Sequence, residues 1–139
     1  MNKVVVGDAD ALIALTLEND PHHRKAVTIA HMLRKQAYII IFPFTVFPEA
    51  ITTLKRALNQ PHKAHLLNKQ LKEGIFQIEY PDQEVMIRAT TLFEKAVSKK
   101  NTLFDAIVAA TAEKLEANCI FSFDSWYSKQ GFDLAQELA

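Results

Sequence analysis

The sequence feature that most constrains the fold is a run of three valines that ends at a glycine and two carboxylates. Residues 4–6 are all valine, Gly7 follows them, and Asp8 and Asp10 come next. A continuous β-branched run predicts a strand buried on both faces, as in parallel sheets. Asp8 therefore lies where a central strand ends. A carboxylate beside an apolar core is costly unless a partner compensates its charge.

The order of the other segments predicts an α/β fold with a small parallel sheet. Strand segments alternate with helical segments, which is the pattern of a parallel sheet with helices on both faces. We expect roughly four or five strands, at residues 4–6, 38–42, 75–79 and 119–123, and a weak one at 132–134. Helices are expected at residues 11–17, 22–36, 46–59, 62–73, 81–97 and 102–117, with a brief turn over 125–130.

Length and composition favour a single globular domain over residues 1–139. The chain has 139 residues, 49% of them hydrophobic, and no repeat or linker divides it. This length suits one domain with a core of its own. Sixteen basic residues balance sixteen acidic ones, so net charge does not indicate a polyanionic partner. Cys119 is the single cysteine, and neither a signal segment nor a membrane-length apolar run is present. We therefore expect a soluble, cytoplasmic protein.

Five acidic residues stand among apolar neighbours and need an explanation. Besides Asp8 and Asp10, they are Glu49, Asp105 and Asp124, each at a strand end or in a first helical turn. Singly, each has a structural explanation, because acids favour helix N-termini and the segment before Asp105 resembles a capping box. Together they would meet at one edge of the sheet, where a divalent cation relieves their repulsion. An all-oxygen ligand set suits Mg²⁺ or Mn²⁺ and not zinc.

These acids also carry a resemblance to the PIN domain family. The segment from Asp8 to Ile13 resembles the family's opening motif, and Glu49 matches the acid on its third helix. The sequence DAIVAATA, which begins at Asp105, is similar to its most recognisable helix motif, and the strand ending at Asp124 resembles the one that carries the fourth acid. The resemblance runs from about residue 4 to residue 124, and size and motif order are also similar to VapC-type toxins.

The resemblance implies a small parallel sheet wrapped by helices and a metal-dependent endoribonuclease. It implies that Asp8, Glu49, Asp105 and Asp124 are catalytic and hold Mg²⁺ or Mn²⁺. RNA would be the substrate, an antitoxin protein the partner, and a homodimer the assembly. Asp10 stands where the family more often has Thr, Ser or Asn, so it is left open as a further ligand, a helix cap or a base.

Four other residues are candidates for contacts with the substrate. Ser122 lies two residues before Asp124 on the same side of a strand, and Thr45 lies one turn before Glu49. Lys99 and Lys100 lead into the helix of Asp105 and would place positive charge near an RNA backbone. No aromatic-rich RNA-reading motif is visible in the sequence, so base specificity is not predicted.

Two other functions remain open at this point. The motif of Asp8 and Asp10 after an apolar strand also resembles haloacid-dehalogenase-like phosphatases, in which the first Asp is a nucleophile and the second a general acid. Against this reading, the chain is short for that fold and Glu49 would have no role. The other alternative is a non-catalytic PIN-like module that binds RNA or protein.

Overall fold

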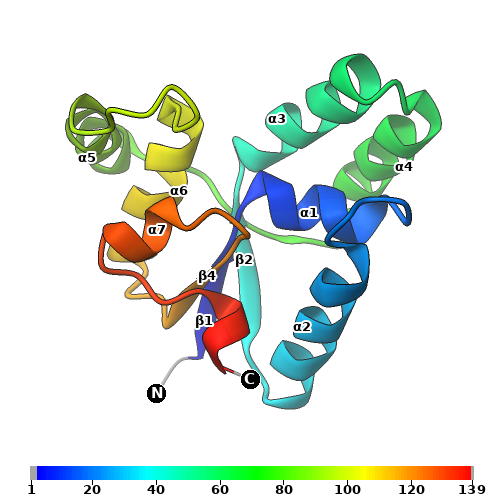
Figure 1. Cartoon of the computed structure of the whole chain (residues 1–139), viewed down its shortest axis with the longest axis horizontal. Helices are drawn as coiled ribbons and strands as arrows, with labels where there is room; N and C mark the ends of the chain where they lie inside the picture. Colours follow the sequence, from blue (N-terminus) through cyan, green and yellow to red (C-terminus); the bar gives the residue numbers. More distant parts are fainter. Residues whose placement is uncertain (1–2, 139) are drawn as a thin grey trace.

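The computed structural model describes residues 3–138 and shows a four-stranded parallel sheet between two layers of helices (Figure 1). The strand order is β3 (Gln77–Glu79), β2 (Ile39–Pro43), β1 (Val4–Gly7) and β4 (Cys119–Phe121). β1 pairs in parallel with β2 on one side and β4 on the other, and all four of its residues are buried. The predicted α/β fold with a central valine strand is therefore confirmed.

Helices connect and cover the strands of this sheet. They are α1 (Ala9–Thr16), α2 (His23–Lys35), α3 (Val46–Thr52), α4 (Pro61–Lys72), α5 (Gln83–Glu94), α6 (Leu103–Lys114) and the short α7 (Trp126–Lys129). A π-helical turn over Thr53–Ala57 continues α3, and a 3-10 turn covers Ala135–Leu138. Within residues 3–138, no helix combines the length and the apolar character needed to cross a lipid bilayer.

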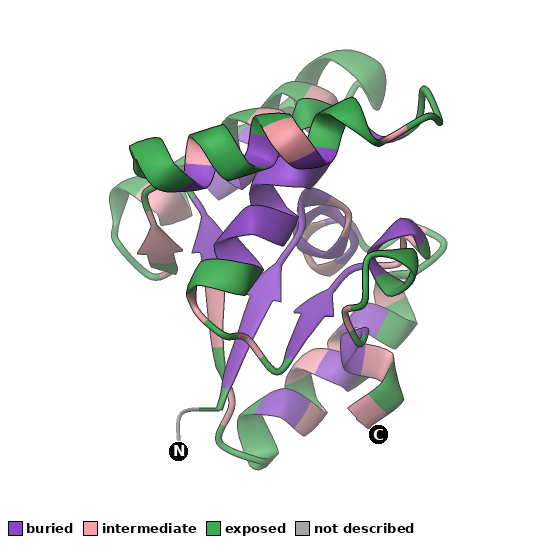
Figure 2. Ribbon diagram, turned by 90° about the vertical axis from the view of Figure 1, so that its left-hand side faces the viewer, coloured by how far each residue is buried: buried purple, intermediate pink, exposed green. Residues whose placement is uncertain are grey.

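The sheet has a hydrophobic core on each face. On one face, Val6 and Ile120 pack with apolar residues of α3, α4, α5 and α6. On the other face, Val5 and Phe121 pack with residues of α1 and α2. Neighbouring strand residues alternate between the faces, so successive valines of β1 serve different cores. β1 and β4 are accordingly buried along their whole length and β2 and β3 only in part, and the outer surfaces of the helices are exposed (Figure 2).

A close approach between β1 and β2 requires glycine at position 7. A Cβ atom at Gly7 would lie only 2.3 Å from Cε1 of the Phe42 ring. Phe42 is buried and packs edge-on against the rings of Phe47 and Phe76, so it has little room to move. The missing side chain of Gly7 thus allows an aromatic ring to fill the core immediately before Asp8.

Four element boundaries differ notably from the sequence prediction. β3 begins at Gln77 and not at residue 75, and β4 ends at Phe121 because the next two residues contact Asp10 instead of continuing the ladder. The helix predicted for residues 46–59 stops earlier, since its last turn is π-helical and Asn59 has a φ of 52°. The helix predicted to reach residue 97 ends at Glu94.

The weak strand predicted at residues 132–134 is wrong. Leu134 forms only an isolated parallel bridge with Ile120. The N–H of Ile120 donates to the Asp133 carbonyl at 2.9 Å, but the chain enters the 3-10 turn at Ala135, so the pairing stops at a single bridge. The segment 125–130, predicted as a turn, contains the single-turn helix α7.

Candidate functional site

All five of the acids singled out in the sequence lie at the carboxyl edge of the sheet. Asp8 follows β1 and Asp124 follows β4, while Asp10, Glu49 and Asp105 lie in the first turns of α1, α3 and α6. Asp8 and Asp105 are buried, with exposed fractions of 4% and 9%. The parallel strands and the helices that follow them thus bring together residues from four separate parts of the chain.

The carboxylates are close enough to raise one another's pKa. Burial raises the pKa of Asp8 well above its usual value, and the charges of Asp10, Asp105 and Glu49 raise it further. Burial, with repulsion from Asp105 and then Asp10, raises the pKa of Glu49 to about 7. Burial is also the main cause that raises the pKa of Asp10 to about 6 and that raises the pKa of Asp105. The group therefore resists carrying its full negative charge.

Asp8 is held by two neutral hydroxyl groups. Its Oδ2 atom accepts hydrogen bonds from the Tyr127 hydroxyl at 2.9 Å and from Ser122 Oγ at 3.1 Å. Its Oδ1 atom accepts from the backbone N–H of Ala9 at 2.7 Å, so Asp8 is also the N-cap residue of α1. These hydrogen bonds orient the carboxylate but supply no positive charge.

Asp10 joins α1 to the end of β4. Its Oδ2 atom accepts from the backbone N–H of Phe123 at 2.8 Å and lies 3.0 Å from Ser122 Oγ. Because Asp8 caps α1, the helix-cap role considered for Asp10 is not the one observed. The single hydroxyl proton of Ser122 cannot serve both carboxylates at once. One of its two contacts is therefore a hydrogen bond only when a carboxyl group carries a proton, in agreement with the raised pKa values.

Asp105 and Asp124 are linked by Asn101. The Asn101 side-chain amide lies 3.0 Å from Asp124 Oδ2 and 3.5 Å from Asp105 Oδ2. Asp105 Oδ2 also accepts the backbone N–H of Thr102 at 2.9 Å, which confirms the capping-box reading of this position. Asp124 Oδ1 accepts from the backbone N–H of Trp126 at 2.9 Å and so holds the start of α7. These acids have structural roles that do not use all of their oxygen lone pairs.

Three buried oxygen atoms at this edge have no hydrogen-bond partner among residues 3–138. They are Oδ1 of Asp10, Oε1 of Glu49 and Oγ1 of Thr45. Buried polar atoms are normally paired, so unpaired oxygens gathered in one place indicate an absent partner. Thr45 and Glu49 lie one turn apart, as the backbone N–H of Glu49 donates to the Thr45 carbonyl at 3.3 Å.

The donor set fits a divalent cation of the Mg²⁺ type. In the described part of the chain, the ion pairs use other acids, and none of these five carboxylates pairs with Lys, Arg or His. In the same part, no three Asp, Glu, His or Cys side chains are arranged as a set of metal ligands. Mg²⁺ commonly uses one or two carboxylates and keeps several water molecules, so a three-ligand set is not required. Unpaired carboxylate oxygens at one edge suit that kind of coordination.

Other side chains at the site differ in how well the sequence predicted them. Ser122 lies among the acids, as expected, and its oxygen accepts the backbone N–H of Asp124 at 3.1 Å. Lys99 and Lys100 are exposed and contact none of the five acids. Sequence reasoning missed the roles of Tyr127 and Asn101. A buried tyrosine needs a partner for its hydroxyl, but the sequence alone does not show that Tyr127 is buried.

Comparisons with known proteins give consistent results. The model of the PIN domain family matches residues 5–132. Among solved structures, VapC20 of Mycobacterium tuberculosis, a toxin described as cleaving the sarcin–ricin loop, is 18% identical with a TM-score of 0.77, covering 92% of this chain and 95% of that one. FitAcB of Neisseria gonorrhoeae is 18% identical with a TM-score of 0.67, covering 94% and 95%.

A third similar structure comes from a toxin–antitoxin complex of Klebsiella pneumoniae. It is 19% identical with a TM-score of 0.59, and the match covers 87% of each chain. At these identities the likeness shows a shared fold. No curated protein matches the sequence significantly.

Proposed function

The chain belongs to the PIN domain family, and from this premise we propose that it is a metal-dependent endoribonuclease. The observation that carries the proposal is the group of five carboxylates at one sheet edge, with no basic partner among residues 3–138 and with buried oxygens left unpaired. Family membership leaves the phosphatase hypothesis without support. RNA is the substrate that the family resemblance implies.

Asp8, Glu49, Asp105 and Asp124 would hold Mg²⁺ or Mn²⁺, and Asp10 is close enough to contribute its free Oδ1 atom. A divalent cation lowers the pKa of a bound water molecule and offsets charge on the phosphate oxygens. The protein's own contribution is orientation: Ser122 and Tyr127 fix the Asp8 carboxylate, and Asn101 fixes Asp124.

Of the four acids proposed to hold the metal, Glu49 is best placed to accept a proton from the attacking water. Its Oε1 atom has no hydrogen bond within residues 3–138, whereas Asp8, Asp105 and Asp124 are each held by at least two donors. A general base needs a free oxygen within hydrogen-bonding reach of the proton that it removes. Thr45, one turn earlier with an unpaired Oγ1, would help to position the water or the substrate.

The direct test is cleavage of a labelled single-stranded RNA with Mn²⁺ or Mg²⁺. We expect activity that EDTA abolishes and that Asp8→Asn and Asp105→Asn each remove. Glu113→Gln is the control, because Glu113 is an exposed acid that pairs with Arg88 away from the site. Cleavage that persists in EDTA, or that survives both Asn substitutions, would overturn the proposal. Tight RNA binding without any cleavage would favour the non-catalytic alternative.

We also propose that the chain is the toxin of a toxin–antitoxin pair and forms a homodimer. Support for the toxin role comes from the similar structure in a toxin–antitoxin complex, and the homodimer is what the family resemblance implies. A groove of about 580 Å³ between α1, α2 and α4 offers the antitoxin an apolar floor that includes Leu12, Ile40 and Phe76, with Arg34 and Lys63 at its rim.

Expression of the chain in a bacterial host should arrest growth. Asp105→Asn, or co-expression of a neighbouring small gene, should relieve the arrest. The neighbouring gene product should co-purify with the chain, and Leu66→Glu in the groove should prevent this. Growth arrest that persists with Asp105→Asn would contradict the toxin role. For the homodimer, light scattering of the purified chain should give the mass of two copies, and the mass of one copy would contradict it.

A further inference from the structure

An exposed pair of stacked aromatic rings lies at the same sheet edge as the carboxylates. Phe44 and Tyr80 have ring centroids 5.3 Å apart and an interplanar angle of 20°. Tyr80 is 65% exposed and Phe44 is 37% exposed, although large aromatic side chains are usually well buried. Neither ring is part of the two hydrophobic cores of the sheet. Packing of the core therefore does not explain the pair.

Strand register places this pair beside the acids. Val6 is level with Ile41, so Asp8 is level with Pro43, and Pro43 is the register partner of Glu79. Phe44 and Tyr80 directly follow the last residues of β2 and β3, one position beyond the level of Asp8. Neighbouring strands are about 4.8 Å apart, so β3 lies only about 10 Å across the sheet from β1. A short stretch of nucleic acid at the carboxylates would reach the rings.

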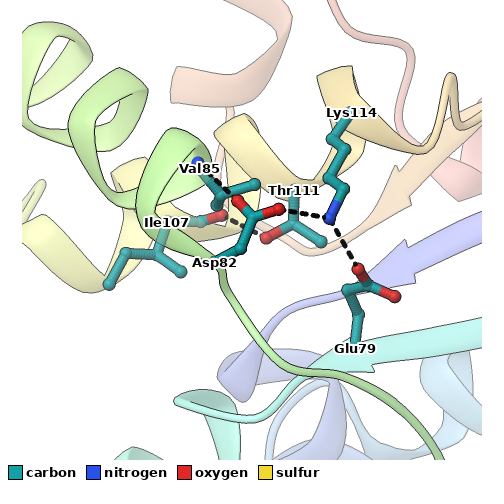
Figure 3. Close-up of polar contacts among 6 residues, drawn as sticks. All are labelled: Glu79, Asp82, Val85, Ile107, Thr111 and Lys114. Atoms are coloured by element: carbon teal, nitrogen blue, oxygen red, sulfur yellow. Dashed lines mark hydrogen bonds and ion pairs between the residues drawn. The ribbon is translucent and has the colours of Figure 1, made fainter.

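Lys114 binds the two acids that flank the Tyr80–Pro81 segment, as Figure 3 shows for Glu79 and Asp82, and so holds this backbone before any ligand arrives. Lys114 of α6 binds Glu79 Oε2 at 3.2 Å and Asp82 Oδ2 at 2.8 Å, and these two acids lie on either side of the Tyr80–Pro81 segment. Asp82 Oδ1 accepts the backbone N–H of Val85 at 2.9 Å and so caps α5. On the other strand, the N–H of Phe44 donates to the Glu79 carbonyl at 2.9 Å.

We propose that the Phe44–Tyr80 pair is a stacking platform for an unpaired base of the RNA substrate, next to the scissile phosphate. The inference rests on the proposed ribonuclease function and names the substrate class as single-stranded RNA. Two rings that already stack nearly in parallel leave the outer face of the more exposed ring free for a third ring. Stacking on aromatic side chains is tolerant of sequence, since every base has a π-face. A fixed platform also loses little entropy when it binds.

The platform binds single-stranded RNA in preference to duplex RNA. Bases in a duplex are already stacked on their neighbours, whereas unpaired bases can turn onto a protein ring. The platform therefore selects loops and single strands, and it anchors the base while the carboxylates act on the phosphate. It supplies the base contact that no motif in the sequence revealed.

The test uses a single-stranded RNA that carries 2-aminopurine, whose fluorescence falls when the base stacks. The full chain is titrated without added metal, so binding is measured apart from cleavage. We expect quenching with the native chain and with Tyr80→Phe. With Tyr80→Ala or Tyr80→Leu we expect about tenfold weaker binding and loss of quenching. Ile75→Ala is the matched control, because Ile75 is 60% exposed but lies before β3, toward the opposite edge.

The outcomes separate this inference from the proposed function. In cleavage assays with Mn²⁺, Tyr80→Ala should raise KM with a smaller change in kcat, and the preference for single strands over duplexes should shrink. Equal binding and quenching by Tyr80→Ala and the native chain would overturn the platform, even if both cleave RNA. If Tyr80→Ala changes only the mass in sedimentation, the pair belongs to a protein interface and the inference is wrong. Absence of cleavage by the native chain would instead contradict the ribonuclease proposal.

Discussion

Two groups of acidic side chains in this molecule are held in opposite ways. Glu79 and Asp82 share Lys114 at the surface, and its hydrogen bond and charge lower the pKa of Asp82. At the carboxyl edge, burial and mutual repulsion raise the pKa values of Asp8, Asp10, Glu49 and Asp105. The chain supplies a cation to the first group and, within residues 3–138, none to the second. The first group is neutralised within the fold, whereas under the proposed function an external divalent cation would neutralise the second.

The largest expected difference between the two groups is in catalysis. Glu49→Gln and Glu79→Gln are the same chemical change in one member of each group. We expect Glu49→Gln to lower kcat/KM for RNA by about a hundredfold or more, as for loss of a general base. Glu79→Gln should leave kcat/KM within about threefold, because its ion pair lies at the surface and Lys114 still binds Asp82 on the other side of Tyr80. Equal losses from the two substitutions, measured with Mn²⁺ present, would remove the distinction.

The second-largest expected difference between the two groups of acids is in how folding stability depends on pH in the presence of EDTA. The folded-state pKa of Asp10 is raised to about 6 and that of Glu49 to about 7, so the folded protein holds these protons more tightly than the unfolded chain. Their stabilising contribution is full below about pH 4 and is lost as pH rises through about 6 and 7. We expect the free energy of unfolding to fall by about 3 kcal/mol over this window, after a discount for the partly exposed Glu49.

Urea unfolding at pH 4.5, 6 and 7.5 measures this loss. The Asp10→Asn and Glu49→Gln double variant should show a flatter profile, because it lacks the two titrating groups. Asp82 behaves oppositely: its pKa is lowered, so its contribution is present above its unfolded-state value and is lost as the pH falls below it. A profile that rises from pH 4.5 to 7.5 and is unchanged in the double variant would contradict the assignment.

Addition of a divalent cation should offset the loss of folding stability that repulsion among the carboxylates at the sheet edge causes. A ligand at a hundred times its dissociation constant stabilises the folded state by about 2.7 kcal/mol. For a chain of this size, that corresponds to a rise in Tm of roughly 5–10 °C. We expect Mn²⁺ to produce the rise in the native chain and in Glu79→Gln, but not in Asp8→Asn. Differential scanning fluorimetry in matched ionic strength checks this, and a rise of the same size in Asp8→Asn would count against the site.

The smallest expected effect concerns the paired acids. Lys114→Met removes the cation shared by Glu79 and Asp82. Surface ion pairs contribute little, so we expect the Tm to fall by no more than about 2 °C and RNA cleavage at saturating substrate to stay unchanged. A fall comparable to that from loss of the metal would show that the two groups are energetically alike.

The sequence was sufficient to predict the fold and the position of the acids. Periodicity located β1 and the helices, and parallel topology then required Asp8, Glu49, Asp105 and Asp124 to meet at one edge. It was insufficient where side chains from distant segments decide the outcome. Tyr127 reaches Asp8 from 119 residues away, which no local pattern reveals.

The aromatic pair was missed for the same reason. Phe44 and Tyr80 stand in unrelated sequence contexts and become neighbours only through the register of β2 and β3. The false strand at residues 132–134 had apolar residues of the right kind, but the chain turns into a 3-10 helix at Ala135 after a single bridge to Ile120. Local pattern thus predicts elements, and tertiary contacts decide their ends and their chemistry.

The pairing of β1 with β4 has a consequence for synthesis of the protein. Ser122 and Asp8, which touch in the folded state, are 114 residues apart in the chain. A ribosome that has made β1, β2 and β3 has not yet made the strand that completes the edge. Ribosomes synthesise chains at about 5–20 residues per second, and the N-terminal part emerges first. The nascent chain therefore has no assembled carboxylate edge for several seconds, and under the proposed function it could not cleave RNA during that time.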